Sequence, residues 1–230
     1  MSRTTKIGML LAATVGCYQM TALANGGGMA APAPTATAAV RTPEALAKDA
    51  YNSGISHRDK GDQAEADMAK KTDVKDKAKA LAKAKDEYTK GYKDFEKATQ
   101  ILPNFYQAFN GMGYTSRKTG DYTKALDMYN KALSLAPGFP DAIEYRGVAF
   151  LKLNRIDDAK AAYLDLFARD RKNAADLMKE MTNWVAEQQA NPSGVDPAVV
   201  SSLNAWIQER AKIAVTTSAM ALTGHRSIWD

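Results

Sequence analysis

The stretch NFYQAFNGMGYTSRKTGDYTKALDMYNKALSLAP, residues 104–137, overlays on the segments before and after it when the chain is shifted by 34 residues. The residues that recur in step are Phe95, Tyr129 and Tyr163, then Gly113 and Gly147, then Pro103 and Pro137. Within the stretch, apolar and small residues return at three- and four-residue steps, so they share one face of a helix. A 34-residue period made of two amphipathic helices predicts an array of stacked helical hairpins.

The turn within each hairpin has its own signal. Gly120 permits a left-handed helix end, and Asp121 can accept a hydrogen bond from the first N–H groups of the next helix. One period later Asn154 occupies the same point, and Asn also tolerates that conformation. Small residues such as Gly113 predict close helix crossings, with Gly147 at the equivalent crossing one period on.

Residues 104–137 closely resemble a tetratricopeptide repeat. The resemblance implies an all-α fold, a short α-solenoid of hairpins of this type whose first hairpin is elongated and which a C-terminal pair of helices caps. The expected segments are hairpins at 43–103, 104–137 and 138–172, capping helices at 173–215 and a loosely ordered tail at 216–230.

The first hairpin carries an insertion of roughly 25 residues relative to the period. Either Gly61 and Asp62 form the turn before one very long helix, or both helices are lengthened and the turn lies at Thr72-Asp73. Spacing favours the second arrangement, because a seam of small and apolar residues runs along each half. The seam residues are Val74, Ala78, Leu81, Ala84, Tyr88, Gly91 and Phe95, facing Gly54, His57, Gly61, Ala64 and Met68.

The third hairpin departs from the pattern before the cap begins. Leu166 stands where a small residue is expected, and Arg171 stands in place of a proline. Two amphipathic segments follow, separated by Asn191-Pro192-Ser193-Gly194. We expect them to cover the last apolar face, with Trp184 and Trp206 in the core.

The N-terminus has the pattern of a cleaved export signal. Arg3 and Lys6 precede the apolar run 7–15, and Ala22-Leu23-Ala24 forms an A-x-A site, which predicts cleavage after Ala24. Residues 25–42 are rich in Gly, Ala, Pro and Thr and are expected to be a flexible linker. An export signal on such a repeat array suggests a bacterial periplasmic protein.

Cys17 is the single cysteine and lies inside this signal. Gly16 before it fits a lipoprotein acylation site, whereas Thr14 stands where lipoproteins usually carry Leu. Cleavage after Ala24 is the favoured interpretation, and a lipid anchor at Cys17 is the alternative.

Charge and chemistry exclude several classes of function. The net charge of +5 is mild and its signs are interleaved, which argues against nucleic acid, and the apolar run is too short for a membrane span. The lysine-rich run KDKAKALAKAK, residues 75–85, is interpreted as a solvated helix face diluted by nearby acids. We expect no enzymatic activity, cofactor or metal, because no nucleophile motif or phosphate-binding loop occurs and His57 and His225 lie in different contexts.

By the same resemblance, the first helix of each hairpin lines a concave groove that binds a protein or peptide. The implied lining residues are Tyr51, Ile55, Arg58, Gln107, Asn110, Tyr114, Arg117, Glu144, Val148 and Leu151. The lysine and asparagine pattern that some members use to clamp a terminal carboxylate is absent, since Tyr51, Ile55 and Asp141 occupy those positions.

The leading hypothesis is therefore a non-enzymatic protein-interaction scaffold of the bacterial cell envelope. One alternative is a structural subunit that forms a homo-oligomer through the elongated hairpin or the surface around Leu166. A lipid-anchored envelope assembly factor is the other. The identity of the protein partner does not follow from the sequence.

Overall fold

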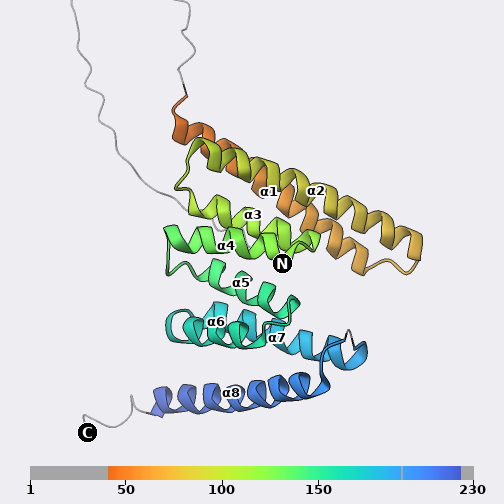
Figure 1. The fold of residues 1–230 in the computed structure, drawn as a ribbon, viewed down its shortest axis with the longest axis vertical. Helices are drawn as coiled ribbons and strands as arrows, with labels where there is room; N and C mark the ends of the chain where they lie inside the picture. The colour runs from red at the N-terminus through yellow and green to blue at the C-terminus, as the bar shows by residue number, and fades with distance from the viewer. Residues whose placement is uncertain (1–40, 193, 224–230) are drawn as a thin grey trace, which may run out of the picture. The chain divides into compact units, whose positions relative to one another are not determined.

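The computed structural model describes residues 41–192 and 194–223, with side chains described through residue 213, and these residues are all-α with no strand (Figure 1). The helices are α1 (Pro43–Ala69), α2 (Val74–Ile101), α3 (Tyr106–Thr119), α4 (Tyr122–Leu135), α5 (Pro140–Lys152), α6 (Ile156–Arg169), α7 (Arg171–Ala190) and α8 (Pro197–Thr223).

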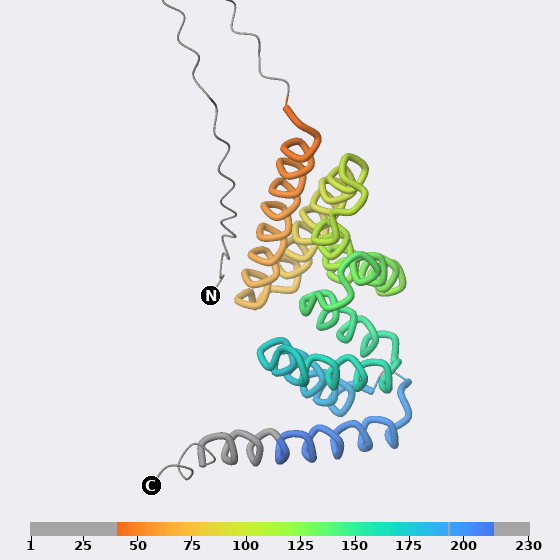
Figure 2. The backbone as a smooth tube through the Cα atoms, turned by 90° about the vertical axis from the view of Figure 1, so that its left-hand side faces the viewer, coloured from red at the N-terminus to blue at the C-terminus, as the bar shows by residue number. Residues whose placement is uncertain are grey.

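Consecutive helices pack as pairs, α1 with α2, α3 with α4, α5 with α6 and α7 with α8. The first helices of successive pairs also touch, because α3 contacts both α1 and α5, and α5 contacts α7. The pairs follow one another in chain order in the second view as well (Figure 2). The predicted fold class, an all-α solenoid of helical hairpins, is confirmed.

The predicted helix ends are found where the sequence places them. Thr42 caps α1, its Oγ1 accepting a hydrogen bond from Ala45 N at 3.2 Å, and Pro43 begins the helix. Gly120 adopts φ +93°, and the carboxylate of Asp121 accepts a hydrogen bond from Lys124 N at 3.0 Å. Asn154 lies at φ +58°, so it ends α5 in the left-handed conformation.

The first hairpin is elongated on both sides of its turn. The turn comprises residues 70–73, and Asp73 caps α2 by accepting hydrogen bonds from Lys75 N and Asp76 N. The alternative turn at Gly61 and Asp62 is wrong, because Gly61 is buried in the interior of α1.

Glycines in these helices make room for aromatic rings. A methyl group added at Gly61 would lie 2.4 Å from the ring of Tyr88, and one at Gly54 would lie 2.7 Å from the ring of Phe95. Neither distance leaves space for a side chain, so each ring lies directly on the backbone of α1. This explains why two glycines are kept inside one long helix despite their cost of about 1 kcal/mol each relative to Ala.

The outer part of the predicted seam does not pack. Ala84, Tyr88, Gly91 and Phe95 are buried, but Val74 is 80% exposed, and Leu81 and Ala78 are exposed too. The loop end of this hairpin extends past α3 and α4, so no third helix covers it (Figure 1). The apolar periodicity of α2 continues to the turn, whereas the side chains are buried only where α3 and α4 lie beside the hairpin.

The C-terminal part forms one continuous core that runs from Ala125 in α4 to Ile207 in α8. Trp184 is buried in this core and Trp206 packs against it, as predicted. Leu166 is fully buried, so its own side chain is not exposed for the self-association considered from the sequence.

Gly113 and Gly147 both lie against the second helix of their own hairpin. A methyl group at Gly113 would meet Tyr129 of α4 at 2.5 Å, and one at Gly147 would meet Ala162 of α6 at 3.3 Å. Gly147 differs in that Leu177 of α7 also reaches it, at 2.7 Å, because α7 packs against α5.

Two helix bounds in the C-terminal part differ from the sequence-based expectation. Helix α7 begins at Arg171, directly after Asp170, which ends α6 and also caps α7. The backbone helix α8 continues to Thr223, beyond the expected end at 215.

The predicted signal peptide with Cys17, nearly all of the linker, and His225 lie outside the described residues. Within the described ranges, no helix is long and apolar enough to cross a bilayer.

Candidate interaction surface

Four side chains from three first helices form a cation–aromatic strip, which we define as Arg58 of α1, Tyr114 and Arg117 of α3 and Tyr145 of α5. The Arg117 guanidinium carbon lies 5.1 Å from the ring centroid of Tyr114 and 5.5 Å from that of Tyr145. The two rings meet edge to face with centroids 5.3 Å apart, and Arg58 approaches Tyr114 at 5.8 Å. Cations at these distances are attracted by the faces of the rings.

Asp62 holds one end of the strip in place. Its Oδ1 accepts hydrogen bonds from the hydroxyls of Tyr88 and Tyr114, each at 2.7 Å. Burial, together with the charge and hydrogen bond of Asp62, raises the pKa of Tyr114 well above its ordinary value. Lys118 of α3 pairs with Glu65 of α1 beside this site, so α1 and α3 are joined by polar contacts as well as by packing.

Arg117 has no carboxylate at ion-pair distance within the described residues, and its Nε is buried without a hydrogen-bond partner. Its nearest polar neighbour is the buried hydroxyl of Tyr129. Burial raises the pKa of Tyr129 to about 12, and the charge of Arg117 and a hydrogen bond with its side chain oppose that rise. A guanidinium that lies between two aromatic rings and has no carboxylate beside it is suited to a carboxylate from another molecule.

Two acidic side chains of α5, Asp141 and Glu144, lie near Tyr145, and burial together with their charges raises its pKa. Burial raises the pKa of Glu144 to about 7, with further contributions from Asp176 and Asp141. Lys172 and Arg117 oppose this rise in part. Asp141 accepts a hydrogen bond from Asn173 Nδ2 at 3.0 Å, which orients it beside α7. The surface therefore offers a cationic part and an acidic part.

The predicted lining residues are only partly brought together. Arg58, Tyr114 and Arg117 form the strip, and Glu144 lies close enough to Arg117 for their charges to interact. Gln107 is half-buried and is not a member of the strip, and Asn110 is buried with its Oδ1 unpartnered.

Two other predicted lining residues belong to different surroundings. The ring of Tyr51 packs against Phe105 with centroids 4.9 Å apart, in a small apolar cluster. Ile55 lines a separate pocket of about 760 Å³ between α1 and α2.

Val148 and Leu151 are not surface residues. They are 3% and 1% exposed and lie in the continuous core, because α7 packs against α5. The family-based assignment of these two positions to an open groove is therefore wrong for this chain. Their apolar side chains stabilise the junction between α5 and the C-terminal helices instead.

Two important residues were missed by the sequence analysis. The position one period before Tyr145 is Gly111, so no repeat signal marks Tyr145. The Gly-Asp pair at 61–62 has the composition of a turn, which gives no signal that Asp62 accepts hydrogen bonds from a helix seam. Only the spatial arrangement shows that Asp62 accepts hydrogen bonds from Tyr88 and Tyr114, which are 26 and 52 residues away in sequence.

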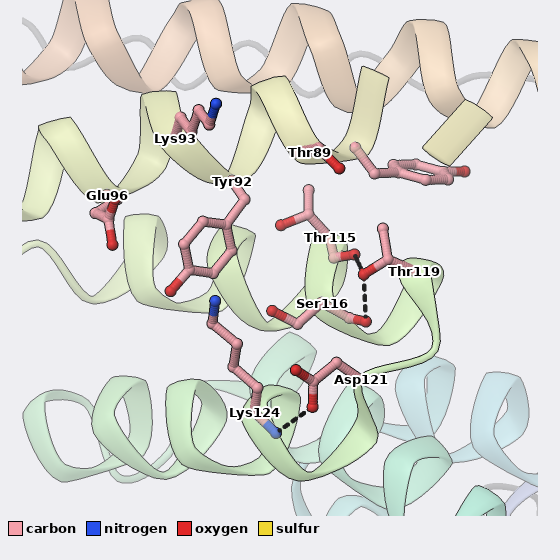
Figure 3. Close-up of a pocket in the computed structure, with 10 residues that line it drawn as sticks. Thr89, Tyr92, Lys93, Glu96, Thr115, Ser116, Thr119, Asp121 and Lys124 are labelled. Carbon is pink, nitrogen blue, oxygen red and sulfur yellow. Dashed lines mark hydrogen bonds between the residues drawn. The ribbon is translucent and has the colours of Figure 1, made fainter. Parts of the chain in front are cut away.

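A polar pocket of about 370 Å³ lies between α2, α3 and α4 (Figure 3). The Lys124 ammonium lies 3.8 Å from the ring centroid of Tyr92. Thr119 donates its hydroxyl hydrogen bond to backbone carbonyls, whereas the buried Ser116 hydroxyl has no partner.

The described residues contain no group of three or more His, Cys, Asp or Glu side chains placed to hold a metal ion. His57, which the sequence analysis considered as a ligand, is engaged by Glu87, with Nδ1 and Oε2 2.7 Å apart. This hydrogen bond is the largest cause of the lowered pKa of Glu87.

The stacked pairs define the class of the protein, an α-helical repeat array. A family model described as tetratricopeptide repeat matches residues 117–180, which span the end of α3 through the middle of α7. This match covers less than a third of the chain, and together with the all-helical architecture of packed pairs it is consistent with a tetratricopeptide repeat protein. No curated protein matches the chain. The repeat indicates a protein–protein interaction scaffold, and the family is typically non-catalytic.

Proposed function

We propose that this protein is a non-enzymatic scaffold that binds an extended peptide or a segment of a partner protein along the cation–aromatic strip. The observation that carries the proposal is Arg117, a guanidinium between Tyr114 and Tyr145 that has no carboxylate at ion-pair distance within the described residues. A partner carboxylate would supply a charged acceptor. Aromatic rings on both sides would exclude water and strengthen that contact.

The chemistry of the bound segment follows from the two parts of the surface. Arg117 favours an acidic or carboxylate-bearing portion, whereas Arg58 is already paired with Asp59 at 2.7 Å. Glu144 with Asp141 favours a basic portion. A segment with both signs of charge would be bound in one orientation, because the reversed orientation brings like charges together. Peptide recognition on first helices of stacked hairpins suits this arrangement.

The proposal is tested with peptides and two matched variants. Wild-type protein is used to select binders from a displayed peptide library, and affinities of the selected peptides are measured by fluorescence anisotropy. Arg117→Met, which keeps an apolar stem but removes the donors, should weaken binding by about tenfold or more. Arg155→Met is the control, since Arg155 also lies over an aromatic ring, Phe150, but away from the strip.

Two results would contradict the proposal. Either no peptide is selected from the library, or Arg117→Met and Arg155→Met lose peptide affinity equally. Arg117→Met is preferred to truncating Tyr114, because Tyr114 hydrogen-bonds Asp62 and packs against Tyr145, so its removal would also reduce stability.

We further propose that the scaffold acts in the periplasm of a bacterium after cleavage following Ala24. The support is the A-x-A site behind a basic start and an apolar run. Mass spectrometry of the protein purified from cells tests this. A chain beginning at Asn25 supports periplasmic export, whereas a diacylated chain beginning at Cys17 supports the lipid-anchored alternative.

A further inference from the structure

The loop end of the α1–α2 hairpin is a surface that neither the repeat architecture nor the proposed peptide site uses. We name residues 70–85 the lysine tip. The tip contains seven lysines, two aspartates, no arginine and no aromatic residue. All its residues are exposed except Ala80 and Ala84, and it extends beyond α3 and α4 (Figure 1).

The positive charge of the tip is not neutralised within the hairpin. Lys70 is the only tip lysine that forms an ion pair within the described residues, with Asp67 at 3.3 Å. The carboxylate of Asp73 is occupied as the cap of α2. Six lysine ammonium groups are therefore available to an external anion, and they are concentrated within about four turns of one helix and its preceding turn.

An exposed apolar stripe runs among these lysines. Val74, Ala78 and Leu81 follow at steps of four and three, so they share one face of α2. Val74 is 80% and Leu81 38% exposed. On the helical wheel Lys75 and Lys77 border this stripe on its two sides. A helix with an apolar stripe bordered by lysines has the composition of a segment that lies in a membrane interface.

We propose that the lysine tip docks peripherally on a lipid bilayer that carries anionic headgroups. In the docked state Val74 would be inserted among the headgroups, with Lys75 and Lys77 beside it in contact with them. The remaining free lysines would contribute through the attraction between their charge and the anionic surface. Lysine suits this position because its long aliphatic stem can lie along apolar surface while its ammonium group contacts the headgroups.

The composition of the tip favours lipid over other partners. Protein interfaces are enriched in arginine and aromatic residues and depleted in lysine, which is the opposite of the tip. Single-stranded nucleic acid is bound largely by aromatic stacking, and the tip has no aromatic side chain to provide it. A second copy of the tip would bring like charges together. Only the bilayer matches both the lysines and the apolar stripe.

The test uses the full chain and co-sedimentation with two kinds of vesicle, phosphatidylcholine alone and an equal mixture with phosphatidylglycerol. We expect binding to the mixed vesicles only, weakening as salt is added. Changing Lys75, Lys77 and Lys79 together to Gln should weaken binding by about a hundredfold, taking about fivefold for each lysine near the surface.

The matched control changes Lys48, Lys97 and Lys179 to Gln, three exposed lysines outside the tip that remove the same net charge. This variant should bind nearly as wild type. Val74→Ser should weaken binding by about tenfold through loss of the inserted apolar group, without affecting the fold. Circular dichroism checks that each variant keeps its helix content.

The proposal is wrong if neither vesicle binds the chain, or if the tip and control variants lose affinity equally, since binding would then reflect net charge alone. Retention of a DNA duplex or of an acidic polypeptide in place of the mixed vesicles would identify another anionic partner and also overturn it. The peptide-binding assay with Arg117→Met is unaffected by either outcome, so the two proposals fail separately.

Discussion

The first hairpin and the C-terminal helices bury their side chains in different ways. From α4 to α8 a single apolar cluster runs through consecutive helices, with Leu177 and Leu203 fully buried. The first hairpin has only small clusters, and it depends on two rings, Tyr88 and Phe95, that lie on the glycines of α1. The same kind of helical hairpin is thus stabilised by a shared core in one region and by a few close contacts in the other.

This difference shows what stacking provides. A hairpin with neighbours on both sides can bury large side chains on several faces, whereas an end hairpin can bury them only toward α3. The first hairpin meets this limit by letting two aromatic rings approach the backbone closely. Past the last neighbouring helix, its loop end buries almost nothing and carries lysine instead.

The largest expected effect is the difference in unfolding free energy lost when a core leucine and a leucine of the lysine tip are each changed to Ala. Leu177→Ala should lower the free energy of unfolding by about 3 kcal/mol, because Leu177 is fully buried and fills the gap at Gly147. Leu81→Ala should change it by less than about 0.5 kcal/mol, because Leu81 is 38% exposed. Urea unfolding followed by circular dichroism measures both. Similar losses of unfolding free energy in the two variants would show that the lysine tip is packed as tightly as the C-terminal core.

A smaller effect is expected from filling a helix gap in the first hairpin. Gly61→Ala gains about 1 kcal/mol of helix propensity but forces a methyl group against the ring of Tyr88, 2.4 Å away. The ring cannot withdraw, because Tyr88 is fully buried and its hydroxyl is bonded to Asp62. We expect a net loss of about 1 kcal/mol of unfolding free energy.

Gly138→Ala is the control for that variant, since the atom nearest to its added methyl group is Arg169 Nη1 at 4.0 Å. This variant should be nearly neutral in the same urea measurement. A Gly61→Ala protein that is more stable than the wild type would show that the first hairpin has room for the added methyl group beside Tyr88.

The smallest effect concerns pH and contrasts Glu144 with Glu87. Because the pKa of Glu144 is raised from 4.5 to about 7 in the folded state, the folded protein holds a proton there that the unfolded chain releases. This stabilisation is complete below pH 4.5 and is lost as the pH rises through about 7. Glu87 behaves in the opposite way, because its lowered pKa costs stability as the pH falls.

Unfolding free energy measured between pH 4.5 and about 7 should therefore fall more steeply in the wild type than in Glu144→Gln, by of the order of 1 kcal/mol across the window. Equal slopes would mean that Glu144 is hydrated in the folded protein.

Local signals were predicted well, because they depend on neighbours along the chain. The caps at Thr42 and Asp121 and the left-handed Asn154 follow from each residue's own chemistry. Burial was predicted less well. Val74 and Leu81 continue the seam pattern but have no helix beside them, and Val148 fits the pattern of a groove residue but lies in the core.

The candidate site shows the same limit. Arg58, Tyr114 and Arg117 could be named from their positions within the repeat, whereas Tyr145 and Asp62 could not. Their importance comes from contacts across three helices, such as the hydroxyl of Tyr114 donating to Asp62 from 52 residues away. No periodic signal records a contact between residues that occupy different positions in their repeats.

The sequence alone determined the hairpins, their turns and the small residues at their crossings, because helix periodicity and capping are local properties of the chain. The tertiary structure decided which apolar faces are covered and which charged groups meet. The physical reason is that burial and ion pairing depend on how far each neighbouring helix extends. A helix that ends one turn earlier leaves the same sequence pattern exposed to water.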